Sequence, residues 1–278
     1  MSEGAAPLAV VVCGAAGRMG RLLVALARED PQLVLAGAVE APGHPALGRD
    51  AGEVAGGTAL GVTIGAELWP ICRPEQVVLD FTAPDAALAH ARVAAECGAG
   101  VVVGTTGLHA EQDRELRAQA GRTRAVIAPN MSVGVTVLTE LVAQAARLLG
   151  DGFEAEIVEL HHHEKKDAPS GTALALGRAI AAARSQDFTR VGVLARQGLV
   201  GARSPHEIGV VALRAGDVVG DHTVVFGGLG ERLELVHRAQ SRECLARGAL
   251  RAARWVAAQR AGVYSMRDVL GLQGTNLL

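Results

Sequence analysis

The residues best suited to acid–base chemistry are concentrated between positions 159 and 173, in the run ELHHHEKKDAPSGTA. Histidine has an ordinary pKa close to neutrality, and lysine supplies a positive charge that attracts anions. Three histidines and two lysines within the six positions 161–166 therefore combine a candidate proton donor with a local excess of positive charge. This composition points to a site that protonates a small anionic molecule.

This run lies at a junction between a strand and a helix. The apolar segment 153–160 has the pattern of a strand, and the Ala- and Leu-rich segment 172–183 has the pattern of a helix. Pro169 fixes φ before the helix, and either Ser170 or Thr172 is suited to cap it. The exposed N–H groups of the first helical turn bind a carboxylate or a phosphate.

Two simpler interpretations compete with that of an active site. A surface loop followed by a capped helix would need only the Ser-Gly-Thr segment, and it leaves the cluster of histidines and lysines unexplained. A zinc site is disfavoured because the histidines are consecutive, alternate in direction if extended, and lack a metal-binding spacing such as HExxH. We expect no metal.

The run resembles the signature of the dihydrodipicolinate reductases (4-hydroxy-tetrahydrodipicolinate reductases), which has roughly the pattern E-x-H-H-x-x-K-x-D-A-P-S-G-T. These are NAD(P)H enzymes of the diaminopimelate route to lysine. The resemblance implies that His161 is the catalytic acid and Lys165 the catalytic lysine. It implies substrate-binding roles, toward a small dicarboxylate, for His162, Ser170, Gly171 and Thr172.

The first forty residues predict a nucleotide-binding unit independently. A β-branched run, 8–13, is followed by the glycine-rich turn GAAGRMG and by a helical pattern to Arg28. A second strand, 33–39, ends at Glu40, where an acidic residue accepts hydrogen bonds from the adenine ribose. We therefore expect cofactor contacts from Gly14, Ala15, Ala16, Gly17, Arg18, Met19, Gly20 and Glu40.

Three more predicted strands, 77–81, 100–103 and 126–128, each end in a polar or glycine-rich turn. Turns at the carboxyl ends of parallel strands are where open α/β sheets bind ligands. In the resembled family, the segments GTTG and A-x-N-(F/M)-S-x-G line the nicotinamide, and the chain has both. The resemblance thus adds Gly104, Thr105, Thr106, Ala128, Pro129, Asn130 and Met131 to the expected cofactor site.

The residue after Glu40 bears on the choice of cofactor. Members of the resembled family that use NADPH well often have an arginine there, whereas this chain has Ala41-Pro42-Gly43. A carboxylate without an adjacent guanidinium repels a 2′-phosphate. We expect NADH to be preferred, with NADPH also possible.

Composition excludes several classes of protein. The 278 residues include 27 basic and 29 acidic ones, a net charge of −2, which gives no reason to expect binding to nucleic acid or to an anionic membrane. The start lacks the positive segment of a signal peptide, so we expect a cytoplasmic protein. The four cysteines have no zinc or CxxC spacing and are expected to be buried free thiols.

The order of elements predicts an α/β protein with a Rossmann-type parallel-sheet nucleotide domain. In the resembled family the last long helix returns to this domain, so the resemblance implies that the domain is discontinuous, 1–132 and 242–278. The glycine- and proline-rich stretch 41–63 is expected to be a loop on its rim. Period-two runs after position 200 predict that the inserted α+β domain, 133–241, contains a mixed or antiparallel sheet. By resemblance, that domain binds substrate and assembles a homotetramer.

Two functional alternatives remain open at this stage. One is a related nicotinamide reductase with another substrate, which the complete His, Lys and Ser-Gly-Thr elements disfavour. The other is a non-catalytic protein that senses NADH, which would need no proton donor.

Overall fold

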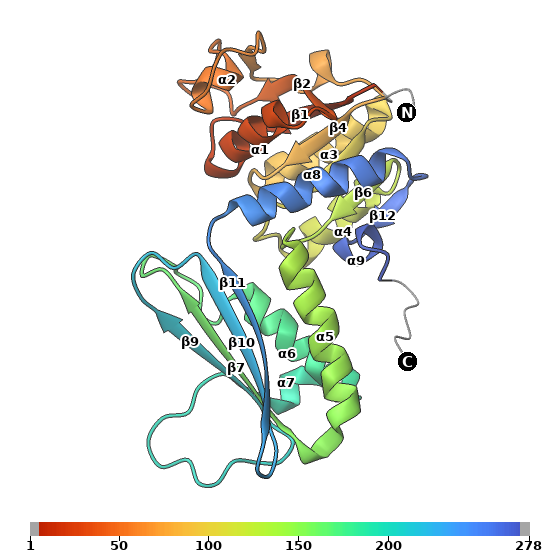
Figure 1. Cartoon of the computed structure of the whole chain (residues 1–278). Coiled ribbons are helices and arrows are strands. Elements are labelled where there is room, and N and C mark those ends of the chain that lie inside the picture. The colour runs from red at the N-terminus through yellow and green to blue at the C-terminus, as the bar shows by residue number, and fades with distance from the viewer. Residues whose placement is uncertain (1–5, 273–278) are drawn as a thin grey trace. The chain divides into compact units, whose positions relative to one another are not determined.

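The computed structural model describes residues 6–272, and the chain divides into two compact units (Figure 1). One unit contains the residues up to 133 together with those from 243 onward, and the other is Gly134–Arg242. The chain therefore leaves the first unit once and returns to it.

The first unit is built on a parallel sheet of seven strands. Their order is β3-β2-β1-β4-β5-β6-β12, and every neighbouring pair is parallel. The strand order reverses between β1 and β4, which is the switch point at which such sheets bind dinucleotides. The predicted Rossmann-type sheet is confirmed. The strands are β1 (Leu8–Cys13), β2 (Leu33–Val39), β3 (Ile64–Gly65), β4 (Val77–Asp80), β5 (Gly100–Val103), β6 (Arg124–Ile127) and β12 (Gly262–Tyr264).

Helices cover both faces of this sheet because alternate residues of its buried strands point to opposite faces. Val10 and Val12 of β1 pack in one core cluster with α1 (Arg18–Glu29) and α8 (Glu243–Ala257). Val11 and Cys13 pack in the other with α3 (Pro84–Cys97) and α4 (Ala110–Ala120). The short elements are α2 (Ala51–Val54), η1 (Trp69–Ile71) and α9 (Met266–Val269).

The second unit contains a mixed sheet in the order β11-β10-β7-β9-β8, as the sequence predicted. Strand β10 is antiparallel to both β7 and β11, whereas β9 is parallel to β7 and β8. One face packs on α5 and α6 through a single hydrophobic core. The elements are α5 (Val133–Leu149), η2 (Gly150–Gly152), β7 (Glu154–His161), α6 (Gly171–Ala183), α7 (Phe188–Val191), β8 (Gly192–Val193), β9 (Ile208–Arg214), β10 (Gly220–Gly227) and β11 (Arg232–Ala239).

Helix α5, extended by η2, is long and apolar enough to cross a membrane by length and composition alone. Its residues Leu138, Val142 and Ala146 are buried in the same core as β7 and α6. Packing against the mixed sheet therefore accounts for its apolar face.

The opposite face of the mixed sheet is open in the chain described here. Val158 of β7 pairs in register with Val211 of β9 on one side and with Thr223 of β10 on the other. Thr223 in turn pairs with Val236 of β11. Val211 is 38% exposed and Val236 is 45% exposed. A row of β-branched side chains thus crosses an uncovered sheet surface.

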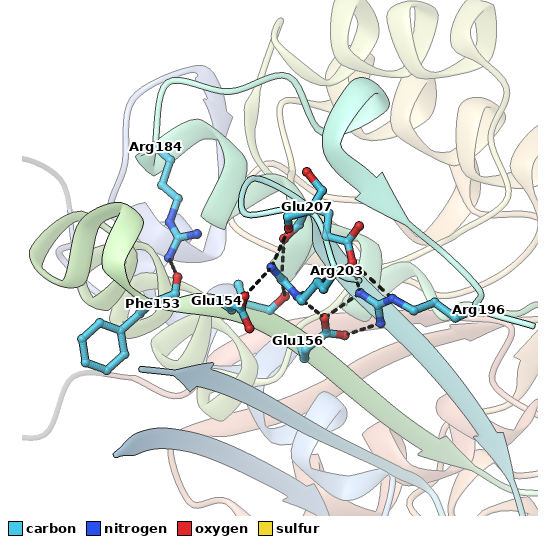
Figure 2. Close-up of polar contacts among 9 residues, drawn as sticks. Phe153, Glu154, Glu156, Arg184, Arg196, Arg203 and Glu207 are labelled. Atoms are coloured by element: carbon cyan, nitrogen blue, oxygen red, sulfur yellow. Dashed lines mark hydrogen bonds and ion pairs between the residues drawn. The ribbon is translucent and has the colours of Figure 1, made fainter. Parts of the chain in front are cut away.

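The long connection between β8 and β9 is tied to β7 by ion pairs (Figure 2). Glu156 of β7 binds Arg196 at 2.7 Å and Arg203 at 2.9 Å, and Arg196 also binds Glu207 at 2.5 Å. Two arginines therefore link this carboxylate to both ends of the connection. Burial raises the pKa of Glu156, but the bonds to Arg196 and Arg203 together outweigh burial and lower this pKa below its ordinary value.

Some sequence-based expectations were wrong in detail. The stretch 41–63 contains α2, because Asp50 accepts hydrogen bonds from Gly52 N and Glu53 N and so caps a helical turn. Two of the four cysteines, Cys97 and Cys244, are only half-buried, since they lie at helix ends rather than within strands. Elements α4, α9 and β12 were not anticipated.

Candidate active site

The glycine-rich turn after β1 is tight and is joined to the end of β2. Gly14 has φ +73°, a conformation that favours glycine. A Cβ on Gly20 would lie 2.0 Å from the Gly14 carbonyl oxygen, so only glycine permits α1 to begin this close to the strand. Ala16 N donates to Glu40 Oε2 at 3.0 Å. The structure thus brings the predicted phosphate turn and the predicted ribose carboxylate together.

The turns after β4 and β5 share one buried carboxylate, Asp80. Its Oδ1 accepts hydrogen bonds from Thr82 N at 3.1 Å, Thr82 Oγ1 at 2.9 Å and Thr105 Oγ1 at 2.7 Å. Its Oδ2 lies 2.6 Å from Nδ1 of His90 on α3. Asp80 therefore holds Thr105, a predicted cofactor residue, next to the turn Asp80-Phe81-Thr82.

The remaining predicted cofactor residues lie at the ends of neighbouring strands. Gly104 N donates to Asp80 O, and a Cβ on Gly104 would lie 2.1 Å from the Phe81 ring. Ala128 N donates to Val103 O at 3.1 Å, which continues the pairing of β5 with β6. The side chain of Asn130 accepts from Ser132 N at 2.9 Å. The positions expected to line the nicotinamide thus share one edge of the parallel sheet with the glycine turn.

Cys13, Asp80 and His90 form a group of potential metal ligands, with their candidate ligand atoms within 4.8 Å of one another. Every carboxylate oxygen of Asp80 already has a protein partner. Burial raises the pKa of the Cys13 thiol well above its ordinary value, which disfavours the thiolate that binds metal. The group is better explained as packing beneath the two turns.

In the second unit, His161 is the last residue of β7 and is buried. Its Nδ1 lies 2.5 Å from Oε2 of Glu159, two positions earlier on the same face of the strand. The ring of His222 on β10 packs edge-on against it, with centroids 5.2 Å apart. A Cβ on Gly220 would lie 2.9 Å from His161 Nε2, so this glycine leaves room beside that nitrogen.

Several charges set the protonation of His161. Burial lowers its pKa below the ordinary value, Glu159 opposes this shift, and the positive charges of Lys165 and Arg214 add to it. The pKa of His222 is lowered to about 4, first by burial and then by the positive charge of His161. Near neutral pH, His222 is therefore a neutral neighbour.

The other members of the His- and Lys-rich run have separate partners. His162 is half-buried, and its backbone N–H donates to Val218 O. The ring nitrogen Nδ1 of His163 lies 2.8 Å from Gly216 O. Lys165 Nζ donates to Asp167 Oδ1 at 2.8 Å. The rings of His161 and His163 therefore contact different groups, the Glu159 carboxylate and the Gly216 carbonyl.

Ser170 caps α6 and connects the helix to the buried carboxylate. Its Oγ accepts from Ala173 N at 3.1 Å and lies 3.2 Å from His222 Nε2. Its own N–H donates to Glu159 Oε1 at 2.9 Å. Of the two predicted caps, the structure uses Ser170, and Gly171 begins the helix with its backbone exposed. Thr172 follows, half-buried, in the first turn.

Two family models together match nearly the whole chain. One, described as dihydrodipicolinate reductase, N-terminus, matches residues 8–131, and one described as dihydrodipicolinate reductase, C-terminus, matches residues 134–270. The chain belongs to the dihydrodipicolinate reductase family. The resemblance seen in the sequence is confirmed.

Curated relatives named 4-hydroxy-tetrahydrodipicolinate reductase support this membership. The protein from Anaeromyxobacter sp. (strain Fw109-5) is 52% identical, over 95% of this chain and 98% of its own. The protein from Syntrophus aciditrophicus (strain SB) is 46% identical, over 96% of this chain and 99% of its own. The chain is therefore an oxidoreductase of the dihydrodipicolinate reductase family.

Solved structures show the same fold. The dipicolinate-bound dihydrodipicolinate reductase from Paenisporosarcina sp. TG-14 covers 93% of this chain with a TM-score of 0.71 and 22% identity, and 97% of that chain is covered. An amine dehydrogenase from Mycobacterium smegmatis has a TM-score of 0.59 at 15% identity. Because the fold extends to a differently named enzyme, it does not by itself decide the reaction.

Sequence reasoning assigned no role to Glu159, Arg214 or His222, which contact the other residues of the site. Glu159 had a usable signal, since residues two apart on a strand face the same side and it precedes His161 by two. Arg214 and His222 lie more than fifty positions away in chain order and had no local signal. Asp80 lies at the end of a predicted strand, and nothing in the sequence near it indicates its bond to Thr105.

Proposed function

We propose that the chain catalyses the NAD(P)H-dependent reduction of 4-hydroxy-tetrahydrodipicolinate to tetrahydrodipicolinate in the diaminopimelate route to lysine. The observation that carries this proposal is the buried His161–Glu159 pair beside the capped start of α6, with Lys165 in the same segment. These are the histidine, lysine and Ser-Gly-Thr elements of the family signature. Relatives that bear this enzyme name match the chain over nearly its full length.

The first unit fits a dinucleotide. Gly14, Gly17 and Gly20 form a turn that admits backbone close to a pyrophosphate, at the N-terminus of the twelve-residue helix α1. Glu40 provides acceptors for ribose hydroxyls beside that turn. When bound, the reduced nicotinamide supplies a hydride. We assign cofactor binding to residues 1–132 with 242–278.

The second unit, 133–241, is proposed to hold and protonate the substrate. Transfer of a hydride must be matched by a proton, and His161 and Lys165 are the proposed donors. The anionic groups of a dicarboxylate are proposed to meet His162, the cap Ser170, and the N–H groups of Gly171 and Thr172 at the start of α6. Cationic side chains and N–H groups neutralise this charge without a metal ion.

Three finer assignments complete the proposal. NADH is proposed as the preferred cofactor, because Glu40 is followed by Ala41 rather than by a cation. A homotetramer is proposed, with the open row of Val158, Val211 and Val236 as a contact surface. A cytoplasmic location is proposed in keeping with a biosynthetic reductase. Sedimentation of the purified chain tests the assembly, and a monomer would contradict it.

The decisive test is NADH consumption by the purified protein with the condensation product of pyruvate and aspartate semialdehyde. Oxidation of NADH that depends on this substrate supports the proposal. Binding of NADH without turnover would favour a non-catalytic sensor, and turnover only with another unsaturated acid would favour a related reductase. A His161→Gln variant is the matched control for turnover that does not use this site.

A further inference from the structure

The carboxylate of Glu159 is fully buried, and each of its oxygens has two partners. Oε2 lies 2.5 Å from His161 Nδ1 and accepts from an Arg214 terminal nitrogen at 2.8 Å. Oε1 accepts from the other terminal nitrogen of Arg214 and from Ser170 N, both at 2.9 Å. One side chain therefore joins the end of β7, the end of β9 and the cap of α6.

We infer that Glu159 is a positioning residue that orients the ring of His161 and makes Nε2 the atom that gives up the proton. This inference rests on the proposed function, in which His161 is the acid. An ionised carboxylate only accepts hydrogen bonds, so the Nδ1 atom beside it must carry a hydrogen. The proton that is gained and lost is then on Nε2, next to Gly220, which has no side chain to crowd this nitrogen.

The carboxylate that lies directly against the His161 ring is that of Glu159. The groups that face the ring are Glu159 on β7, Arg214 at the end of β9, Lys165 after β7 and the neutral His222 on β10. Burial and the two cations oppose a charge on His161. Glu159 opposes these effects and favours the charged, proton-donating form of His161.

Arg214 has a second, opposite effect on the same ring. Its two terminal nitrogens bind both oxygens of Glu159 and hold the carboxylate ionised and in place. Its positive charge also disfavours the protonated form of His161. Loss of Glu159 and loss of Arg214 break the same ion pair, yet they should move the protonation of His161 in opposite directions.

This opposition gives a test that a merely structural role would fail. The pKa of His161 is measured by NMR titration of its ring Cε1–H signal in the full-length protein without ligand, with the signal assigned from a His161→Gln variant. We expect Glu159→Gln to lower this pKa by about one unit or more, and Arg214→Gln to raise it. The kcat/KM of Glu159→Gln with the proposed substrate should fall off at correspondingly lower pH.

The outcomes separate the inference from the proposed function. A His161 pKa that is unchanged in Glu159→Gln, or that shifts in the same direction in both variants, would overturn the positioning role whatever the activity. Opposite shifts in a wild-type protein that does not turn over the proposed substrate would overturn the reaction and leave the positioning role standing. If Glu159→Gln does not fold, the His161 pKa in Arg214→Gln decides the inference. A His161 pKa that is unchanged or lowered in that variant contradicts it.

Discussion

Among the residues that the structure describes, each unit contains a fully buried carboxylate that lies against the Nδ1 atom of a histidine, and the two carboxylates differ in their other partners. In the first unit, Asp80 binds His90 and otherwise accepts only from a backbone N–H and from hydroxyl groups of Thr82 and Thr105. In the second, Glu159 binds His161 and is also paired through both oxygens with Arg214.

The difference separates two uses of a buried carboxylate. Neutral donors around Asp80 hold two turns of backbone in one arrangement. An arginine beside Glu159 keeps a negative charge next to a histidine: burial raises the pKa of Glu159, and bonds from Arg214, His161 and Ser170 outweigh this and lower it. The first arrangement suits a binding surface for a cofactor, and the second suits a group that exchanges a proton.

The comparison is tested most strongly by removing each histidine. We expect His161→Ala to lower kcat by about 10²–10⁴-fold, the usual range for loss of a general acid, with NADH affinity unchanged. His90→Ala should leave kcat within about tenfold, because His90 supports a turn and donates no proton to substrate. Steady-state kinetics with fluorescence titration of NADH measure both. Similar losses of kcat in the two variants would contradict the assignment of proton transfer to His161 and of a supporting role to His90.

Removing the charge of Asp80 should affect stability and cofactor binding. Asp80→Asn keeps the size of the side chain and replaces one buried acceptor with a donor, so we expect a loss of about 1–3 kcal/mol in the free energy of unfolding. The dissociation constant for NADH should rise, since Thr82 and Thr105 lose their shared anchor. Urea unfolding and NADH titration measure the two effects. A stable variant with weakened catalysis and normal NADH binding would contradict the anchoring role.

The burial of His222 also makes the second unit sensitive to acid. The folded-state pKa of His222 is about 4, below the ordinary value of 6.5, so the unfolded chain takes up a proton first as pH falls. Stability should therefore fall between pH 6.5 and 4, by at most about 1.4 kcal/mol per pH unit from this residue.

A His222→Gln variant should show a shallower decline over that range in urea unfolding at a series of pH values. The contribution of Glu159, whose folded-state pKa is lowered, is lost only at pH values below its ordinary pKa of 4.5. His90→Gln in the first unit is the matched control. An equally steep decline in wild type and His222→Gln would show that other groups cause the acid sensitivity.

The smallest expected effect comes from adding a cation to the first unit. Glu40 accepts from Ala16 N and Ala41 N and has no arginine in the next position. Ala41→Arg should raise kcat/KM for NADPH relative to NADH by roughly tenfold, the size of one charge-assisted hydrogen bond. The ratio is measured at low and moderate salt, because screening should reduce the gain. A wild-type preference for NADPH would show that another basic residue meets the 2′-phosphate.

The sequence by itself determined the elements whose patterns are local. Strands 8–13, 33–39 and 100–103 have the predicted bounds, because their apolar runs and the turns that follow them are written in neighbouring residues. The local sequence also predicted a capped start for α6 and a strand that ends beside His161. A three-residue strand such as β12 is too short to show a pattern.

Only the tertiary structure decided which residues surround His161. Strand β9 runs parallel to β7 in a register that aligns Arg214 with His161, and antiparallel β10 aligns His222 with Glu159. Strand register follows from how the whole sheet packs on α5 and α6, and a shift by one residue would turn every one of these side chains to the open face. Arg214 lies 55 positions from Glu159 in the chain, so no local pattern could place its guanidinium on that carboxylate.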